Sequence, residues 1–179
     1  DASNLASALI GGVIFNLSNI LLSASVSIAG MSVAFPLGVG LALVLGVFIN
    51  YFNAPQGSPV FLFLGVLLVI VAIVFNAWAY KNMGKGGEQQ KTKGIVIAIV
   101  AGIMMSFFFR FIASSMDLQN FECPEVGKMT PYTAMVIFSI GIFTSNFIFN
   151  TAAMRRPFVG TSTSYGDYFA GSFRLHAVG

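Results

Sequence analysis

The stretch that decides the fold is Pro59–Tyr80, PVFLFLGVLLVIVAIVFNAWAY, which contains no charged residue. A helix rises about 1.5 Å per residue, so roughly 20 apolar residues cross a hydrocarbon core about 30 Å thick. Proline suits the first turn of a helix, where its missing N–H would have no partner. A single segment in hydrocarbon satisfies its backbone hydrogen bonds by being helical. The stretch is therefore predicted to be a transmembrane helix.

The rest of the chain has the same character. Hydrophobic residues make up 56% of the 179 residues and charged residues 8%, and the mean hydropathy is +0.85. A soluble domain is about 25% charged, so this chain has too few charges to cover a water-facing surface. We predict an all-α integral membrane protein with about five transmembrane helices, the other four being Ala6–Ala29, Val33–Phe52, Gly94–Ser114 and Pro131–Ala153.

The positions of the charges predict the orientation. Five spans place the connecting segments alternately on two sides of the membrane. One side carries a single acid, Glu88, and six basic residues, Lys81, Lys85, Lys91, Lys93, Arg155 and Arg156. The other side carries one basic residue, Lys128, and the acids Asp1, Asp117, Glu122 and Glu125. Because Lys and Arg accumulate on the cytoplasmic side, the Lys81–Lys93 loop and the Arg155–Arg156 end are predicted to be cytoplasmic, in the cell (cytoplasmic or inner) membrane.

Polar side chains inside the first span are the first candidates for a binding site. Asn16, Asn19, Ser23 and Ser27 follow one another at helical spacing and share roughly one face. An amide that faces lipid costs several kcal/mol, so this face is expected to meet other helices or a wet cavity. For Asn16 and Asn19, a substrate-lining role and interhelical hydrogen bonding remain equally open. For Ser23, hydrogen bonding between helices is favoured.

Three residues of other spans join these candidates. Pro36 frees the backbone carbonyl of Ser32 and can bend its helix, although a proline so near a helix start can also be benign. Arg110 is the only charge well inside a span and marks a functional site, unless it snorkels to the interface about 24 Å along the helix from Gly94. Asn146 can face the interior of the bundle. The predicted substrate-binding residues are Asn16, Asn19, Ser23, Pro36, Arg110 and Asn146.

Several other functions are excluded or disfavoured. The single cysteine, Cys123, and single histidine, His176, suggest no disulfide, metal site or catalytic pair, so we expect neither an enzyme nor a cofactor. The net charge of +3 forms no basic patch for nucleic acid. The glycine-rich segment 84–87 does not match the phosphate-binding loop pattern and is interpreted as a flexible linker. The small residues Gly38, Ala42 and Gly46, spaced by four, are expected to serve helix packing.

The sequence resembles a known family of transporters. The resemblance is carried by Gly11–Asn19, Ala29–Val33, Gly46–Phe52, Lys93–Ala98, Pro131–Ala134 and Pro157–Gly160. These runs resemble the ureide-permease and glucose/ribose-porter branch of the drug/metabolite transporter superfamily. The resemblance implies part of a ten-helix protein made of two inverted five-helix repeats. Residues 1–80 would be the last three helices of the first repeat, 81–93 a cytoplasmic basic linker, and 94–179 the first two helices of the second repeat with the approach to the next.

The resemblance also implies a function. The chain would belong to a secondary transporter that moves a small polar solute, such as a sugar, a nucleobase or a related metabolite, by alternating access. Asn16, Asn19 and Pro36 would then lie near the substrate. The expected partners are the substrate, the lipid bilayer, a coupling proton or ion, and the missing helices of a longer chain. Two alternatives remain: an exporter of drug-like or lipophilic metabolites, and a non-transporting membrane subunit.

Overall fold

The computed structural model describes residues 1–53, 55, 57–82 and 88–176, apart from the side chains at 80–82, 88–91 and 172–176. Its helices are α1 (Ala2–Ala29), α2 (Met31–Asn53), α3 (Pro59–Asn82), α4 (Glu88–Ser115), α5 (Pro131–Arg155) and α6 (Tyr165–His176). Helices α1 to α5 are long and apolar enough to cross a membrane. Within the described residues there is no sheet, only an isolated bridge between Met116 and Met129. The prediction of an all-α, multi-pass membrane protein is confirmed.

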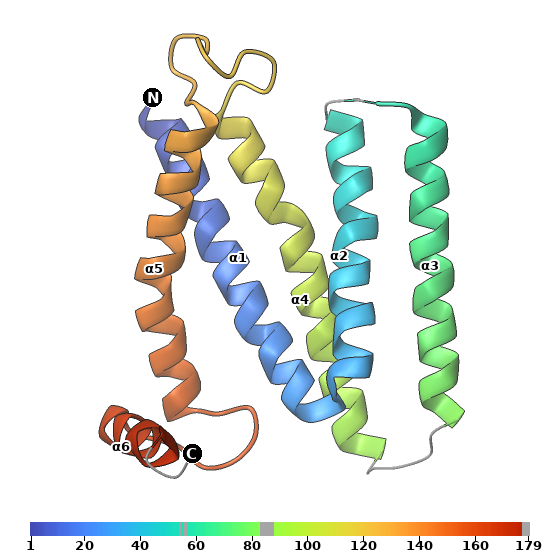
Figure 1. The fold of residues 1–179 in the computed structure, drawn as a ribbon, viewed down its shortest axis with the longest axis vertical. Coiled ribbons are helices and arrows are strands. Elements are labelled where there is room, and N and C mark those ends of the chain that lie inside the picture. The colour runs from blue at the N-terminus through green and yellow to red at the C-terminus, as the bar shows by residue number, and fades with distance from the viewer. Residues whose placement is uncertain (54, 56, 83–87, 177–179) are drawn as a thin grey trace.

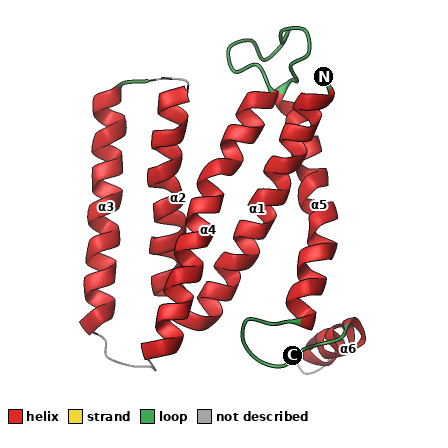
Figure 2. Cartoon of the chain, turned by 180° about the vertical axis from the view of Figure 1, so that it is seen from behind, coloured by secondary structure: helices red, strands yellow, loops and turns green. Residues whose placement is uncertain are grey.

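The five long helices run alternately up and down (Figures 1 and 2). Across the bundle they follow one another in the order α5, α1, α4, α2 and α3. Helix α4 packs against both α1 and α2, α5 packs mainly against α1, and α3 packs against α2 alone among the described helices. Helix α4 thus lies between α1 and α2, although both precede it by more than 30 residues in the sequence.

The ends of the spans agree with the sequence analysis to within a few residues, except around the basic loop. Helix α3 continues to Asn82 and α4 begins at Glu88, so the connection is shorter than the predicted loop of residues 81–93. The physical reason is that Glu, Gln and Lys are good helix formers, so α4 extends beyond its apolar part. The predicted flexible glycine-rich linker, 84–87, lies outside the described residues.

The chain turns sharply between α1 and α2. Gly30 has a φ of 85°, which a residue with a side chain rarely adopts, and its N–H donates to the carbonyl oxygen of Val26. Residues on either side of Gly30 are helical, so the two helices join almost directly.

At the start of α5, Thr130 accepts a hydrogen bond from the N–H of Thr133 at 3.3 Å, and Pro131 occupies the first turn.

Glycines allow the helices to approach closely. A Cβ atom at Gly12 of α1 would overlap the carbonyl oxygen of Phe138 in α5, and one at Gly141 would overlap the carbonyl oxygen of Leu9. A Cβ at Gly102 of α4 would lie 2.5 Å from the carbonyl oxygen of Gly38 in α2. Small residues at helix contacts are typical of membrane bundles, where dispersion contacts hold the helices together. The packing role expected for Gly38 is thus confirmed.

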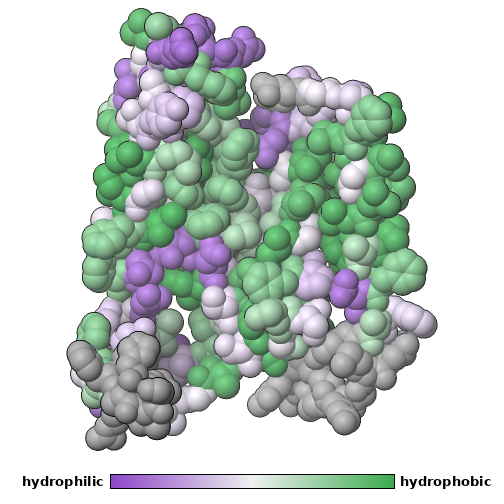
Figure 3. All heavy atoms as spheres, viewed as in Figure 1, coloured by the Kyte–Doolittle hydropathy of each residue, from purple (hydrophilic) through white to green (hydrophobic). Residues whose placement is uncertain are grey.

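The outside of the bundle is largely apolar. Figure 3 shows hydrophobic residues over the sides of the long helices and hydrophilic residues gathered at the upper end, where the loop 116–130 lies. A smaller hydrophilic group interrupts the apolar side lower down. Apolar sides with polar residues gathered at the upper end fit the distribution that a bilayer requires.

Candidate functional site

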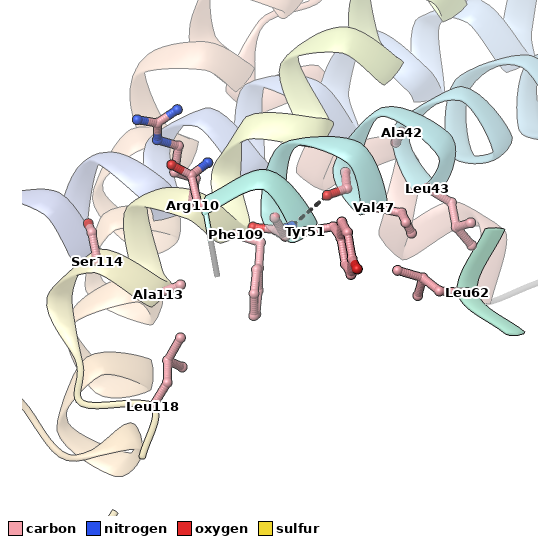
Figure 4. Close-up of a pocket in the computed structure, with 13 residues that line it drawn as sticks. Ala42, Leu43, Val47, Tyr51, Leu62, Phe109, Arg110, Ala113, Ser114 and Leu118 are labelled. Carbon is pink, nitrogen blue, oxygen red and sulfur yellow. Dashed lines mark hydrogen bonds between the residues drawn. The ribbon is translucent and has the colours of Figure 1, made fainter. Parts of the chain in front are cut away.

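A cavity lies between α2 and α4, at the end of the bundle where both helices finish. Its volume is about 650 Å³. It is bordered by Ala42, Leu43, Gly46, Val47, Asn50, Tyr51 and Asn53 of α2, Leu62 of α3, Phe109, Arg110, Ala113 and Ser114 of α4, and Leu118 of the following loop. Figure 4 shows Phe109 and Tyr51 pointing into the space between the helices, with Leu62 at its side.

The cavity follows from the way α2 and α4 cross. The two helices touch at Gly38 and Gly102, and from there they diverge toward the upper end in Figure 1. At Gly46 a Cβ atom would already be 3.9 Å from the nearest atom of α4, the carbonyl oxygen of Ser106. The short side chains of Ala42 and Ala113 leave the widening space unfilled. The glycine crossing near one end thus produces the opening near the other.

Among the described residues, Arg110 is the only charged one that borders this cavity. Its side chain is exposed and leaves α4 in a different direction from that of Phe109 (Figure 4). Among the described residues, none forms a hydrogen bond or an ion pair with its guanidinium. Arg110 lies five residues before the end of α4, about 8 Å along the axis. The guanidinium can therefore present donors to a solute or reach the membrane interface.

The polar groups of α2 supply acceptors beside this cation. The amide nitrogen of Asn50 donates to the carbonyl oxygen of Gly46 at 2.8 Å, the bond drawn in Figure 4, and that of Asn53 donates to the carbonyl oxygen of Ile49 at 2.6 Å. Each bond leaves the amide oxygen as an acceptor. Tyr51 packs edge-on against Phe63 of α3, with ring centroids 5.4 Å apart. The cavity thus combines aromatic walls, amide acceptors and one cation.

Asn16 and Asn19 have different surroundings. Asn16 is buried, and its Nδ2 atom donates to the hydroxyl oxygen of Ser145 in α5 at 2.9 Å and to the carbonyl oxygen of Ile142 at 3.4 Å. Asn19 is half-buried, and its Nδ2 atom donates to the carbonyl oxygen of Phe15 in its own helix at 2.9 Å. Asn16 therefore joins α1 to α5, whereas the bond of Asn19 stays within α1.

The other candidates are dispersed. Ser23 borders a second cavity, of about 320 Å³, between α1 and α5 near the opposite end of the bundle, together with Ser27 and Asn150. Asn146 is exposed, and its amide oxygen accepts from the Nδ2 atom of Asn150 at 2.9 Å. Pro36 is half-buried inside α2. The six predicted residues are thus not brought together: Arg110 borders the larger cavity and Ser23 the smaller one.

The sequence analysis missed Asn50, Tyr51 and Phe109 as residues that border the larger cavity. A signal for Asn50 was present, because it continues the spacing of four that runs through Gly38, Ala42 and Gly46. These small residues were interpreted as packing alone. At Gly46 and beyond, the same stripe faces the opening between α2 and α4.

The loop 116–130 beside the cavity is organised by one carboxylate. Asp117 accepts hydrogen bonds from the backbone N–H groups of Gln119, Asn120 and Glu125, at 2.9, 3.1 and 3.2 Å. The bond from Gln119, then that from Glu125, holds the pKa of Asp117 below its ordinary value, because both stabilise the ionised form. The next residue, Leu118, borders the cavity, so the loop fixes part of its wall.

The described residues contain no cluster of three His, Cys, Asp or Glu side chains that could hold a metal ion. No protein-family model, curated protein or solved structure matches this chain. The five long apolar helices identify it as a multi-pass membrane protein.

Proposed function

We propose that this chain is part of a secondary transporter that moves a small polar solute, such as a sugar, a nucleobase or a related metabolite, by alternating access. The observation that carries the proposal is the cavity between the last turns of α2 and α4, two of the candidate spans, with Arg110 at its border. Its volume of about 650 Å³ is within the usual range of small-molecule sites, about 300–1,000 Å³. A charged group within a membrane helix is costly and commonly marks a solute pathway.

The second cavity supports the same proposal. It lies between α1 and α5, near the opposite end of the bundle from the first. In alternating access, a solute site opens to the two sides of the membrane in turn, as one group of helices rocks against another. Helices α1 and α4, which pack against each other, lie between the two cavities. Opening one cavity while closing the other would require α2 to move against α4 and α5 to move against α1.

Helix α5 supports the presence of further helices in the complete transporter. Ser139, Thr144 and Asn146 are exposed, although they lie well inside the α5 span. The hydroxyl groups of Ser139 and Thr144 donate to carbonyl oxygens of α5, but an amide such as that of Asn146 is expensive in contact with lipid. Additional helices, as in a ten-helix inverted repeat, would cover them or enclose water beside them.

We further propose that the basic end, with Arg155 and Arg156, faces the cytoplasm.

One observation favours the alternative of an exporter for lipophilic metabolites. Much of the larger cavity is walled by apolar side chains, among them Leu43, Val47 and Phe109. The buried amide of Asn16 is also compatible with a non-transporting subunit, because it bonds to Ser145 and so joins α1 to α5.

Transport by the full-length protein in proteoliposomes tests the proposal. We expect uptake of labelled sugars or nucleobases, and we expect Arg110→Leu to reduce it about ten-fold to hundred-fold, because a hydrogen bond to a charged group contributes roughly 1.5–3 kcal/mol. Arg110→Lys should retain part of the activity. Phe107→Leu, at an exposed position on the same helix, is the matched control and should leave uptake unchanged.

Three results would contradict the proposal in different ways. Efflux of dyes without uptake of any polar solute would favour the exporter. Absence of both activities in well-inserted protein would favour the subunit. Unchanged uptake in Arg110→Leu would exclude the Arg110 cavity as the solute site.

A further inference from the structure

Helix α6 lies crosswise at one end of the bundle. It follows α5, and its axis runs across the axes of the five long helices, so that Figure 1 shows it nearly end-on. For this region the sequence analysis predicted only the approach to a further helix. Because the long helices set the direction of the membrane normal, a helix perpendicular to them at their end lies in the plane of the membrane surface.

Specific contacts hold α6 in this position. The N–H of Thr163 donates to the carbonyl oxygen of Met154 at 3.1 Å, and the hydroxyl groups of Tyr165 and Thr151 form a hydrogen bond. Ser164 caps the helix, since its oxygen accepts from the N–H of Asp167 at 3.2 Å while its hydroxyl donates to the Asp167 carboxylate at 2.7 Å. The first turn of α6 is thus tied to the last turns of α5.

The aromatic side chains of α6 are exposed. Tyr165, Tyr168 and Phe169, spaced by three and four residues, share one face of the helix, and they are 45%, 59% and 59% exposed. Apart from the hydrogen bond of Tyr165 with Thr151 of α5, no described helix packs against α6. Tyrosine side chains are enriched at membrane–water interfaces, where the ring meets acyl chains and the hydroxyl meets water. This face is therefore suited to the headgroup level of a bilayer.

Basic groups surround this end of the bundle. Arg155 and Arg156, at the end of α5, are exposed. Lys93, in the first turns of α4, is exposed too, and its Nζ atom donates to the carbonyl oxygen of Phe158 in the segment that leads to α6. The carboxylate of Asp167, which accepts a hydrogen bond from Ser164, offsets one of these three positive charges. The level of α6 therefore carries excess positive charge.

We propose that α6 and the basic ends of α4 and α5 form a membrane-surface site that binds acidic phospholipid headgroups. The aromatic face of α6 lies among the headgroups and upper acyl chains, while Arg155, Arg156 and Lys93 attract the phosphates. The site lies at the end of five helices that are apolar enough to cross a membrane, which favours lipid over another protein as the occupant. Basic residues near a membrane surface and an aromatic helix face act together in this way.

A tryptophan probe tests the position of α6. The only tryptophan, Trp78, is replaced by Phe, and Tyr168→Trp is added, in full-length protein reconstituted into bilayers with brominated acyl chains. We expect a blue-shifted emission that brominated lipid quenches strongly. Val126→Trp in the same background places the probe in a fully exposed loop position and should remain unquenched. An unquenched probe at position 168 overturns the proposal, whether water or protein surrounds it.

A second measurement tests the preference for acidic lipid. Energy transfer from the position-168 tryptophan to dansyl-phosphatidylglycerol is compared with transfer to dansyl-phosphatidylcholine. We expect a preference for the acidic lipid that weakens roughly five-fold for each charge removed in Arg155→Gln and Arg156→Gln. Raising the salt concentration should weaken it in the unsubstituted protein as well. Equal transfer to both lipids, or a preference insensitive to both salt and the substitutions, overturns the proposal.

Discussion

Helices α1 and α3 are both long apolar helices, yet they occupy opposite environments. Helix α1 contacts α2, α4 and α5, and its buried residues are mostly small or polar, among them Gly11, Gly12 and Asn16. Among the described helices α3 packs against α2 alone, and Val66 is its only buried residue in that part of the chain. Nevertheless α3 is the most apolar of the five. In this bundle the most apolar helix is the most exposed, because lipid rather than a protein core surrounds its apolar side chains.

The largest effect on stability is expected from replacing a glycine of α1, with a glycine of α3 as the control. Gly12→Ala would place a methyl group against the backbone carbonyl of Phe138, which no side-chain movement can relieve, and overpacking of this kind costs about 1–3 kcal/mol or more. Gly65→Ala, in α3, is the matched control, since nothing lies within 4 Å of the added carbon. Thermal unfolding in detergent micelles should show a clear loss of stability for the first variant alone. Equal stability of the two would mean that α1 and α5 do not cross at Gly12.

A smaller effect is expected from the asparagines. Asn16→Leu removes the hydrogen bond from α1 to Ser145, and interhelical hydrogen bonds in membranes contribute about 0.6 kcal/mol on average and up to about 1.7. A double-mutant cycle with Ser145→Ala should give a coupling energy in that range. Asn76→Leu in α3 is the control, because Asn76 is exposed and bonds only to Ala72 of its own helix. Additive effects in the cycle would show that Asn16 and Ser145 do not interact.

The smallest effect is expected at the ends of the helices. The amide of Asn4, in the first turn of α1, donates to the carbonyl oxygen of Gly127 in the loop that Asp117 organises, so this loop steadies α1. The pKa of Asp117 is lowered in the folded loop. The stabilisation of the loop by ionised Asp117 is therefore fully present above pH 3.8, the ordinary pKa of an Asp carboxyl. It is lost as the pH falls through the lowered pKa of Asp117.

A spin label on Cys123, the only cysteine, measures this loss directly, because the residue is exposed in the same loop. The label should become more mobile as the pH falls below 3.8, and Asp117→Ala should make it mobile already at neutral pH. Glu122→Gln changes a charge in the loop without touching the three hydrogen bonds and serves as the control. A label whose mobility is the same at all pH values would contradict the role given to Asp117.

The sequence analysis predicted the five spans but could not rank their contacts. Apolar length predicted α3 as securely as α1, since both satisfy the requirement for crossing a bilayer. It could not decide whether Asn16 lines a cavity or bonds to another helix, because that depends on which helix face α5 covers. The sequence analysis also assigned the same packing role to Gly46 as to Gly38, although only Gly38 lies at the crossing with α4.

The sequence by itself determined the helical class and the number of candidate spans, because hydrocarbon leaves a single apolar segment no other way to satisfy its backbone. Charge placement likewise gave a prediction of orientation that needs no contacts. Only the tertiary structure decided that α4 lies between α1 and α2, that the glycine crossing opens a cavity beside Arg110, and that α6 lies across the bundle. These features depend on close contacts between helices far apart in sequence, and the identity of one residue does not specify the partner it meets in space.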